Sequence, residues 1–242
     1  MKLILCSDGD TTAQWAYAGF RGLGCDDLEL VTSEDLAYSL RWSHRIKSDG
    51  STVDIRLADG RQISLASLDG VINRLNWPSR ALIQHATHDD QDYAYSESFA
   101  FYLSWLHALP GKVFNRATPQ GLCGTWRSAA QWAILAGRAG FHVEPYRECE
   151  TGWERSLPSG RTLTSAVLFE GTPFGPHVPA EIETPSRALF ALNGTSLLGI
   201  DFYQSEKGHW YFHGATPLPD LCLGGIPLLQ QVLKSWSSEA IQ

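Results

Sequence analysis

The chain has 242 residues, 43% apolar and 19% charged, with a formal net charge of −7 at pH 7. This length suffices for one domain or two small lobes with a sizeable core, and the composition excludes a disordered tail. The acidic balance argues against nucleic acid or an anionic membrane as a general partner, because both require clustered Lys and Arg. No apolar run approaches the roughly 20 residues of a membrane span.

The first third of the chain has an α/β pattern followed by a hairpin. A buried strand is predicted from Lys2 to Cys6, where the apolar run MKLIL is too short for a signal peptide. The turn at residues 7–10 is expected to cap a helix from Thr11 to Leu23, and a second strand from Leu28 to Val31 follows. Alternating residues around Ala58-Asp59-Gly60 then predict a β-hairpin.

The middle of the chain alternates between strands and helices. Strands are predicted for residues 68–75 and 112–115, and helices for residues 91–109 and 126–140. This order is typical of a doubly wound sheet. A first lobe is therefore expected over residues 1–147.

A second lobe is expected over residues 148–242, opening with a polar excursion from Glu148 to Arg161. Thr184 and Pro185 are expected to open a helix that ends at Asn193. Further strands are predicted for residues 162–170, 197–204 and 209–213, and an amphipathic helix for residues 225–236.

The five cysteines, at positions 6, 25, 123, 149 and 222, form no C-x-x-C pair. Neither a zinc knuckle nor a disulfide framework is indicated, and reduced thiols in a cytoplasmic protein are expected. Cys123 and Cys149 are conceivable nucleophiles, but buried, unreactive thiols are the favoured interpretation.

Several segments resemble the ATP-grasp enzymes that modify ribosomal peptides and their glutathione-synthetase-like relatives. They read DGVINRL, YAYSESFAFYLSWLHAL, VFNRATP, WRSAAQWAILAGRAGFHVEPY and LLGIDFYQSEKGHWYFHGATPLPD. The resemblance implies an α/β fold with a Rossmann-like (pre-ATP-grasp) N-terminal lobe and a reduced ATP-grasp-like C-terminal α+β lobe. It also implies Mg-ATP as a cofactor and carboxylate–amine ligation as the activity.

The chain departs from the pattern that this resemblance implies for ATP binding. A family member would carry one lysine on the helix near Arg127 and another on a strand of a separate central lobe. None of the five lysines, at positions 2, 47, 112, 207 and 234, is placed for either role. Of the implied magnesium ligands only Asp201 matches, because His213 and Ala215 occupy the positions of Glu and Asn.

Two further groups of residues are candidates for binding. Asn73-Arg74 and Asn115-Arg116 end two predicted central strands, where such sheets bind ligands, and their guanidinium groups, with that of Arg127, could grip a carboxylate or phosphate. The alternative is a structural salt bridge from an arginine to Asp69, Glu97 or another carboxylate. Asp201, His209 and His213 could instead bind a borderline metal such as zinc, unless the histidines simply flank Trp210 and Phe212.

Three functions follow from these patterns. The favoured one is a degenerate ATP-grasp-like pseudoenzyme that acts as a binding or accessory subunit of a peptide- or amino-acid-modifying ligase, with a partner ATP-grasp enzyme or a peptide as its ligand. The alternative is a minimal ATP-dependent carboxylate–amine ligase with a non-standard or shared nucleotide site. A second alternative is a metal-dependent enzyme.

Overall fold

The computed structural model describes residues 1–81, 83–109, 112–145 and 161–237. The chain divides into two compact units, the first made of Met1–Thr125 with Gln230–Gln242 and the second of Trp126–Leu229. Helix α4 and strand β8 thus belong to the second unit. The lobe boundary expected at residues 147 and 148, the excursion from Glu148 and Cys149 lie outside the described residues.

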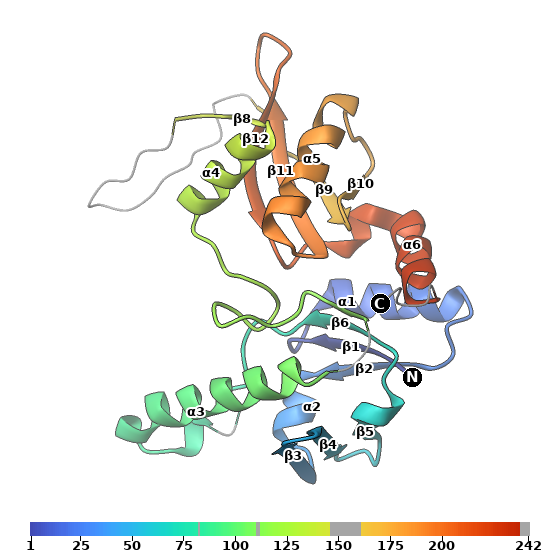
Figure 1. Cartoon of the computed structure of the whole chain (residues 1–242), viewed down its shortest axis with the longest axis vertical. Helices are drawn as coiled ribbons and strands as arrows, with labels where there is room; N and C mark the ends of the chain where they lie inside the picture. Colours follow the sequence, from blue (N-terminus) through green and yellow to red (C-terminus); the bar gives the residue numbers. More distant parts are fainter. Residues whose placement is uncertain (82, 110–111, 146–160, 238–242) are drawn as a thin grey trace. The chain divides into compact units, whose positions relative to one another are not determined.

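A four-stranded parallel sheet forms the centre of the first unit, in the order β2-β1-β6-β7 (Figure 1). Its strands are β1 (Lys2–Cys6), β2 (Leu28–Thr32), β6 (Gly70–Arg74) and β7 (Lys112–Phe114). All four were predicted to within two residues of these bounds. Strands β1 and β6 are almost wholly buried, as expected for central parallel strands covered on both faces.

Two helices of this unit begin at side chains that cap them. The Asp10 carboxylate accepts a hydrogen bond from the Ala13 amide and caps α1 (Thr11–Gly22), which confirms the cap expected in residues 7–10. Thr32 and Asp35 form a capping box around α2 (Ser33–Ala37). The long helix α3 (His88–His107) and the 3-10 turns η1 (Leu65–Ser67) and η2 (Ile83–His85) complete the helical part up to β7.

An antiparallel sheet in the order β3-β4-β5 lies between β2 and β6 in the sequence. It consists of β3 (Arg41–Lys47), β4 (Gly50–Arg56) and β5 (Gln62–Ser64). The predicted hairpin around Asp59 is the β4–β5 pair, whereas β3 was not predicted. Strand β3 pairs with β4 over its whole length, from Arg41 opposite Arg56 to Lys47 opposite Gly50.

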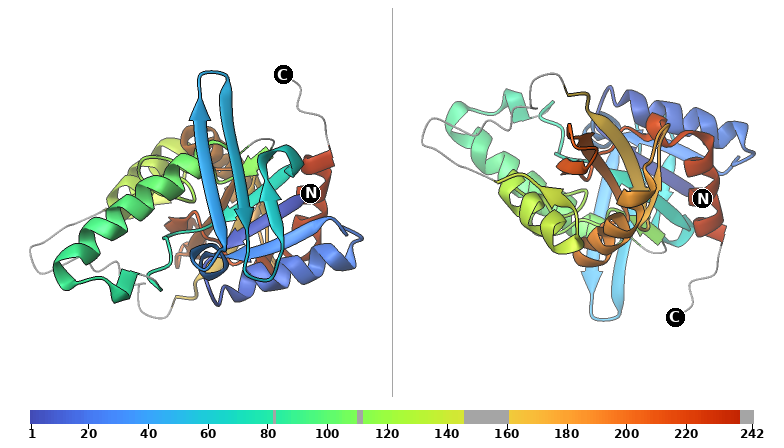
Figure 2. Two further views of the ribbon diagram at one scale, coloured as in Figure 1. Left: turned by 90° about the horizontal axis from the view of Figure 1, so that it is seen from below. Right: turned by 90° about the horizontal axis from the view of Figure 1, so that it is seen from above.

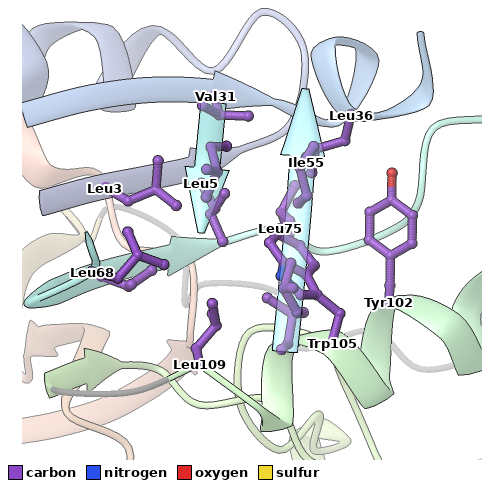
Figure 3. Packing of buried hydrophobic residues seen from close by; sticks show 14 of the residues in the cluster. Leu3, Leu5, Val31, Leu36, Ile55, Leu68, Leu75, Tyr102, Trp105 and Leu109 are labelled. Carbon is purple, nitrogen blue, oxygen red and sulfur yellow. The ribbon is translucent and has the colours of Figure 1, made fainter. Parts of the chain in front are cut away.

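One hydrophobic core joins the two sheets of the first unit. Figure 3 shows Leu3 and Leu5 facing toward Leu75, with Tyr102 and Trp105 of α3 nearby. Trp42 of β3 makes edge-on contacts with Tyr102 and Trp105 at ring-centroid distances of 5.0 Å. These aromatic contacts hold the antiparallel sheet against α3.

The second unit contains a mixed sheet in the order β10-β9-β11-β12-β8. Its antiparallel core is β9 (Thr164–Phe169), β11 (Leu197–Gln204) and β12 (Trp210–Thr216), flanked by β10 (Thr172–Phe174) and β8 (His142–Val143). The register of β11 and β12 shifts between Asp201 and Phe202. At this β-bulge Gly214 lies opposite Asp201, whereas Phe212 lies opposite Phe202.

Helices α4 (Ala129–Ala139) and α5 (Ala180–Asn193) pack on this sheet in Figure 1, followed by η3 (Leu221–Gly224) and α6 (Gly225–Ser237). The expected start of α5 at Pro185 is wrong, because the helix begins five residues earlier and Pro185 lies inside it. Proline lacks the amide N–H that would donate to the carbonyl of Glu181. Ile182 and Ser186, on the same helix, are buried, and their packing stabilises the helix despite this missing hydrogen bond.

No helix in the described part of the chain is long and apolar enough to cross a membrane.

Candidate functional site

The carboxyl edge of the parallel sheet is where ligands bind in doubly wound folds. In-register pairing of β1 with β6 sets Arg74 beside Cys6, directly before the loop that carries Asp10. The Arg74 Nε donates to Asp10 Oδ2 at 2.8 Å, and a terminal nitrogen of Arg74 donates to Oδ1 at 3.2 Å. The salt bridge of Arg74 is therefore to Asp10 rather than to Asp69 or Glu97, and anion binding by Arg74 stays a prediction.

This ion pair is almost removed from solvent, with side-chain exposures of 5% for Arg74 and 13% for Asp10. Burial alone would raise the pKa of the Asp10 carboxyl, but the hydrogen bond and charge of Arg74 outweigh burial and lower it. The sequence carried a signal for this partner, since Asp10 caps a helix at the same sheet edge. Asp69 instead accepts a hydrogen bond from the N-terminal amine of Met1 at 2.7 Å.

Asn73 and Asn115 also meet at this edge. The Asn73 side-chain amide donates to the carbonyl oxygens of Asn115 at 3.0 Å and Leu122 at 2.6 Å, and its oxygen accepts from the Leu75 amide. Asn115 adopts a positive φ of 59°, which asparagine tolerates better than most residues. Both asparagines are buried, so they tie the strand ends to the loop after β7.

The other two predicted arginines also contact their own chain. Arg116 donates to the carbonyl of Leu109 at 3.3 Å. Arg127, in the second unit, donates through Nε to Asn193 Oδ1 at 2.8 Å, and its guanidinium lies 5.8 Å from the Trp132 ring centroid. The structure thus brings Asn73, Arg74 and Asn115 together at one edge and engages Arg127 with the end of α5.

Asp201 projects from the middle of the second sheet, between β9 and β12. In the strand register it stands opposite Ser165 on one side and Gly214 on the other. Ser165 Oγ donates to Asp201 Oδ1 at 2.6 Å, a short charge-assisted hydrogen bond. The facing glycine supplies no side-chain oxygen, so of these two opposite positions only Ser165 offers a polar side-chain group to the carboxylate.

The three predicted metal ligands have different neighbours. His209 precedes β12, and its ring centroid is 5.5 Å from that of His142, whereas His213 packs edge-on against Tyr203 at 6.3 Å. Within the described ranges no group of three or more His, Cys, Asp or Glu side chains could hold a metal ion. The geometry gives the predicted metal site of Asp201, His209 and His213 no support.

The buried cysteines Cys6 and Cys123 are poor nucleophiles. Burial raises the pKa of the Cys123 thiol to about 11, and burial together with the charge of Asp10 raises that of Cys6 to about 12. Because the thiolate is the reactive form, neither thiol is activated at neutral pH. The favoured interpretation of Cys123 as a buried, unreactive thiol agrees with this.

The fold matches that of ATP-grasp peptide ligases. The macrocyclase MdnC from Microcystis aeruginosa MRC, solved with precursor peptide MdnA, shares 10% identity over 97% of this chain and 98% of that chain, with a TM-score of 0.73. The ATP-grasp ligase PsnB with minimal precursor, Mg and ADP shares 13% identity over 98% of each chain, with a TM-score of 0.67. A Chryseobacterium gregarium RiPP-associated ATP-grasp ligase, in complex with ADP and a leader and core peptide, shares 9% identity over 91% of this chain and 90% of that chain, with a TM-score of 0.66.

These likenesses confirm an ATP-grasp-like α/β fold, with a Rossmann-like N-terminal part and a reduced C-terminal α+β part. At such low identity they concern the fold alone. No protein-family model matches the sequence, and no curated protein matches it significantly.

Proposed function

We propose that this chain is a degenerate ATP-grasp-like protein that acts as a binding or accessory subunit of a peptide- or amino-acid-modifying ligase. The observation that carries the proposal is the surroundings of Asp201. Magnesium in nucleotide sites requires carboxylate oxygens together with phosphate oxygens. Here the carboxylate that matches the family pattern has Ser165 and Gly214 opposite it on the two neighbouring strands, and neither supplies a second carboxylate.

The pairing of some arginines of the second unit supports the same proposal. Phosphoryl transfer depends on positive charges held toward the phosphates. Three described arginines of this unit are engaged within it: Arg127 bonds Asn193, Arg161 pairs with Glu206 at 2.9 Å, and Arg187 lies 4.0 Å from Glu183. Each would have to leave its partner to clamp a triphosphate.

A peptide is favoured as the ligand because solved structures with a similar fold contain bound peptides. The MdnC structure contains a precursor peptide, and the PsnB and Chryseobacterium structures contain precursor or leader and core peptides. A chain that keeps this fold without the nucleotide-clamping residues retains a scaffold for peptide binding. Its natural role would then be to present a peptide to an intact ATP-grasp partner enzyme.

Nucleotide titration tests the loss of ATP binding. We expect calorimetry with ADP and with a non-hydrolysable ATP analogue to show no magnesium-dependent binding up to millimolar concentration. The variant Asp201→Asn should behave identically. Micromolar, magnesium-dependent affinity that disappears in Asp201→Asn would overturn the proposal and support the minimal carboxylate–amine ligase instead.

A reconstitution assay tests the accessory role. The chain is added to an intact ATP-grasp peptide ligase from the same source with its peptide, and ADP formation is followed. We expect faster ADP formation with the chain present and none from the chain alone with ATP, magnesium and the peptide. ADP formation by the isolated chain would contradict the accessory role.

A further inference from the structure

Strand β3 presents an open edge. Among the described strands it is hydrogen-bonded only to β4, over seven residue pairs from Arg41 to Lys47. In the left view of Figure 2 the β3–β4 hairpin, in light blue, projects as a long two-stranded arm. An edge strand of this length exposes unpaired backbone N–H and C=O groups, which can pair with an added extended segment.

The two faces of β3 differ in chemistry, because successive side chains of a strand point to opposite faces. Trp42 and His44 face α3, where Trp42 lies 4.8 Å from Phe101 between ring centroids and His44 Nδ1 lies 3.5 Å from Ser104 Oγ. Ile46 continues this apolar row and is 72% exposed. The opposite face carries Arg41, Arg45 and Lys47, with Asp54 of β4 pairing with Arg41 at 3.4 Å.

A cavity of about 310 Å³ opens beside the start of β3, where both Arg41 and Trp42 line it. Its walls come from the segment before β3, from the loop after β6 and from α3. The volume lies at the low end of the range for small-ligand sites, which suits one bulky apolar side chain rather than a whole cofactor. Leu40, at its rim, is 66% exposed. Leu40, Trp42 and Phe101 are among the residues that line it.

We propose that the free edge of β3 binds an extended peptide in which acidic and apolar residues alternate. Such a peptide adds a strand to the β3-β4-β5 sheet. Its acidic side chains lie beside Arg41, Arg45 and Lys47 on one face, and its apolar side chains lie on the Trp42 face, where one enters the cavity. This inference rests on the proposed peptide-binding function and names the docking site and the class of peptide.

Charge selects this occupant over a second copy of the chain. Two copies paired edge to edge through β3 would bring identical cationic rows together, and like charges across a strand pair are destabilising. An acidic strand instead places opposite charges at each cross-strand position on that face. A peptide of alternating Glu and Val residues with one central Phe satisfies both faces.

Fluorescence anisotropy with that labelled synthetic peptide tests the site. Two control peptides separate the contributions: one has Lys in place of every Glu, and one has the same composition with all Glu residues first. We expect saturable binding of the alternating peptide and at least about tenfold weaker binding of both controls, a factor equal to about 1.4 kcal/mol. Equal binding of the three peptides would overturn the proposal.

Surface variants with matched controls locate the binding. Arg45→Glu should weaken the affinity about three- to tenfold, the size expected when one exposed ion pair becomes a repulsion. The control Arg138→Glu reverses an exposed arginine on α4 and should leave the affinity unchanged. Likewise Leu40→Ser should weaken binding, whereas Ile134→Ser, at a side chain 57% exposed, should not.

Hydrogen exchange gives a readout that does not depend on the variants. Bound peptide should slow amide exchange in residues 41–47 of the unmodified protein, and protection confined to other segments would overturn the docking site. A peptide-driven increase in mass to that of a dimer, seen by light scattering, would also overturn it. These results are independent of the nucleotide titration, which tests the proposed function separately.

Discussion

The guanidinium of Arg74 donates to both carboxylate oxygens of Asp10, 64 positions away in the chain, at the carboxyl edge of the parallel sheet. The pair joins the end of β6 to the first turn of α1. Because the pair is buried, an incoming carboxylate would have to displace Asp10 in order to bind Arg74. The consequences can be measured.

Replacing one partner leaves the other charge buried. We expect Asp10→Asn or Arg74→Met to lower the free energy of unfolding at pH 7 by about 3 to 5 kcal/mol. The double variant should lose less than the sum of the single variants, because it leaves no unpaired buried charge. Urea unfolding of the four proteins measures this, and strictly additive losses would show that the two side chains do not interact.

The same pair predicts a pH dependence. Folding lowers the pKa of Asp10 below its ordinary value of 3.8, so its contribution to stability is fully present above that value. The contribution is lost as pH falls through the lowered pKa of the folded state. Urea unfolding between pH 7 and pH 2.5 should therefore show the difference between wild type and Asp10→Asn shrinking below about pH 4. A difference that is constant with pH would contradict the assigned shift.

Gly70 of β6 lies against Trp236 of α6. A Cβ built at Gly70 would come within 2.4 Å of the Trp236 ring. The centroid of that ring lies 5.3 Å from that of Phe20 and 5.8 Å from that of Phe114, so the ring has aromatic neighbours that restrict its movement. We expect Gly70→Ala to cost about 1 to 3 kcal/mol in thermal or urea unfolding, as overpacking does. Gly22→Ala is the control, since nothing lies within 4 Å of its Cβ position, and it should not destabilise the protein.

Arg127 holds the end of α5 through Asn193. The interaction needs the Nε donor and the planar guanidinium over Trp132, neither of which lysine reproduces. Arg127→Lys should therefore lower the free energy of unfolding by about 1 to 2 kcal/mol and should create no nucleotide binding. Magnesium-dependent ADP binding in this variant would show that the missing lysine was all that the site lacked.

Thiol labelling should distinguish the cysteines. Cys222 is exposed, whereas Cys6, Cys25 and Cys123 are buried in the described structure. In the folded protein at pH 7.5, alkylation followed by peptide mass spectrometry should modify Cys222 well before those three. Rapid modification of Cys123 would contradict its raised pKa and its burial.

Local patterns predicted the elements whose signals lie within a few residues. Three such signals each predict the element in which they lie. They are the apolar runs of β1 and β6, the Asp10 cap of α1 and the alternation around Asp59. Strand β3 has no such local signal, because RWSHRIK has few apolar residues and becomes a strand through its pairing with β4. Helix α5 begins earlier than its sequence signal, because proline is typical of a first helical turn, whereas this helix accommodates Pro185 one turn further in.

The sequence by itself determined the α/β order of elements, the resemblance to ATP-grasp enzymes and the absence of a facing Glu and Asn around Asp201. Only the tertiary structure decided which carboxylate Arg74 pairs with, that Ser165 bonds Asp201, and that His209 and His213 lie in different surroundings. The reason is physical: helix and strand signals act over a few residues, whereas a side chain's partner depends on strand order and register, which bring distant positions together.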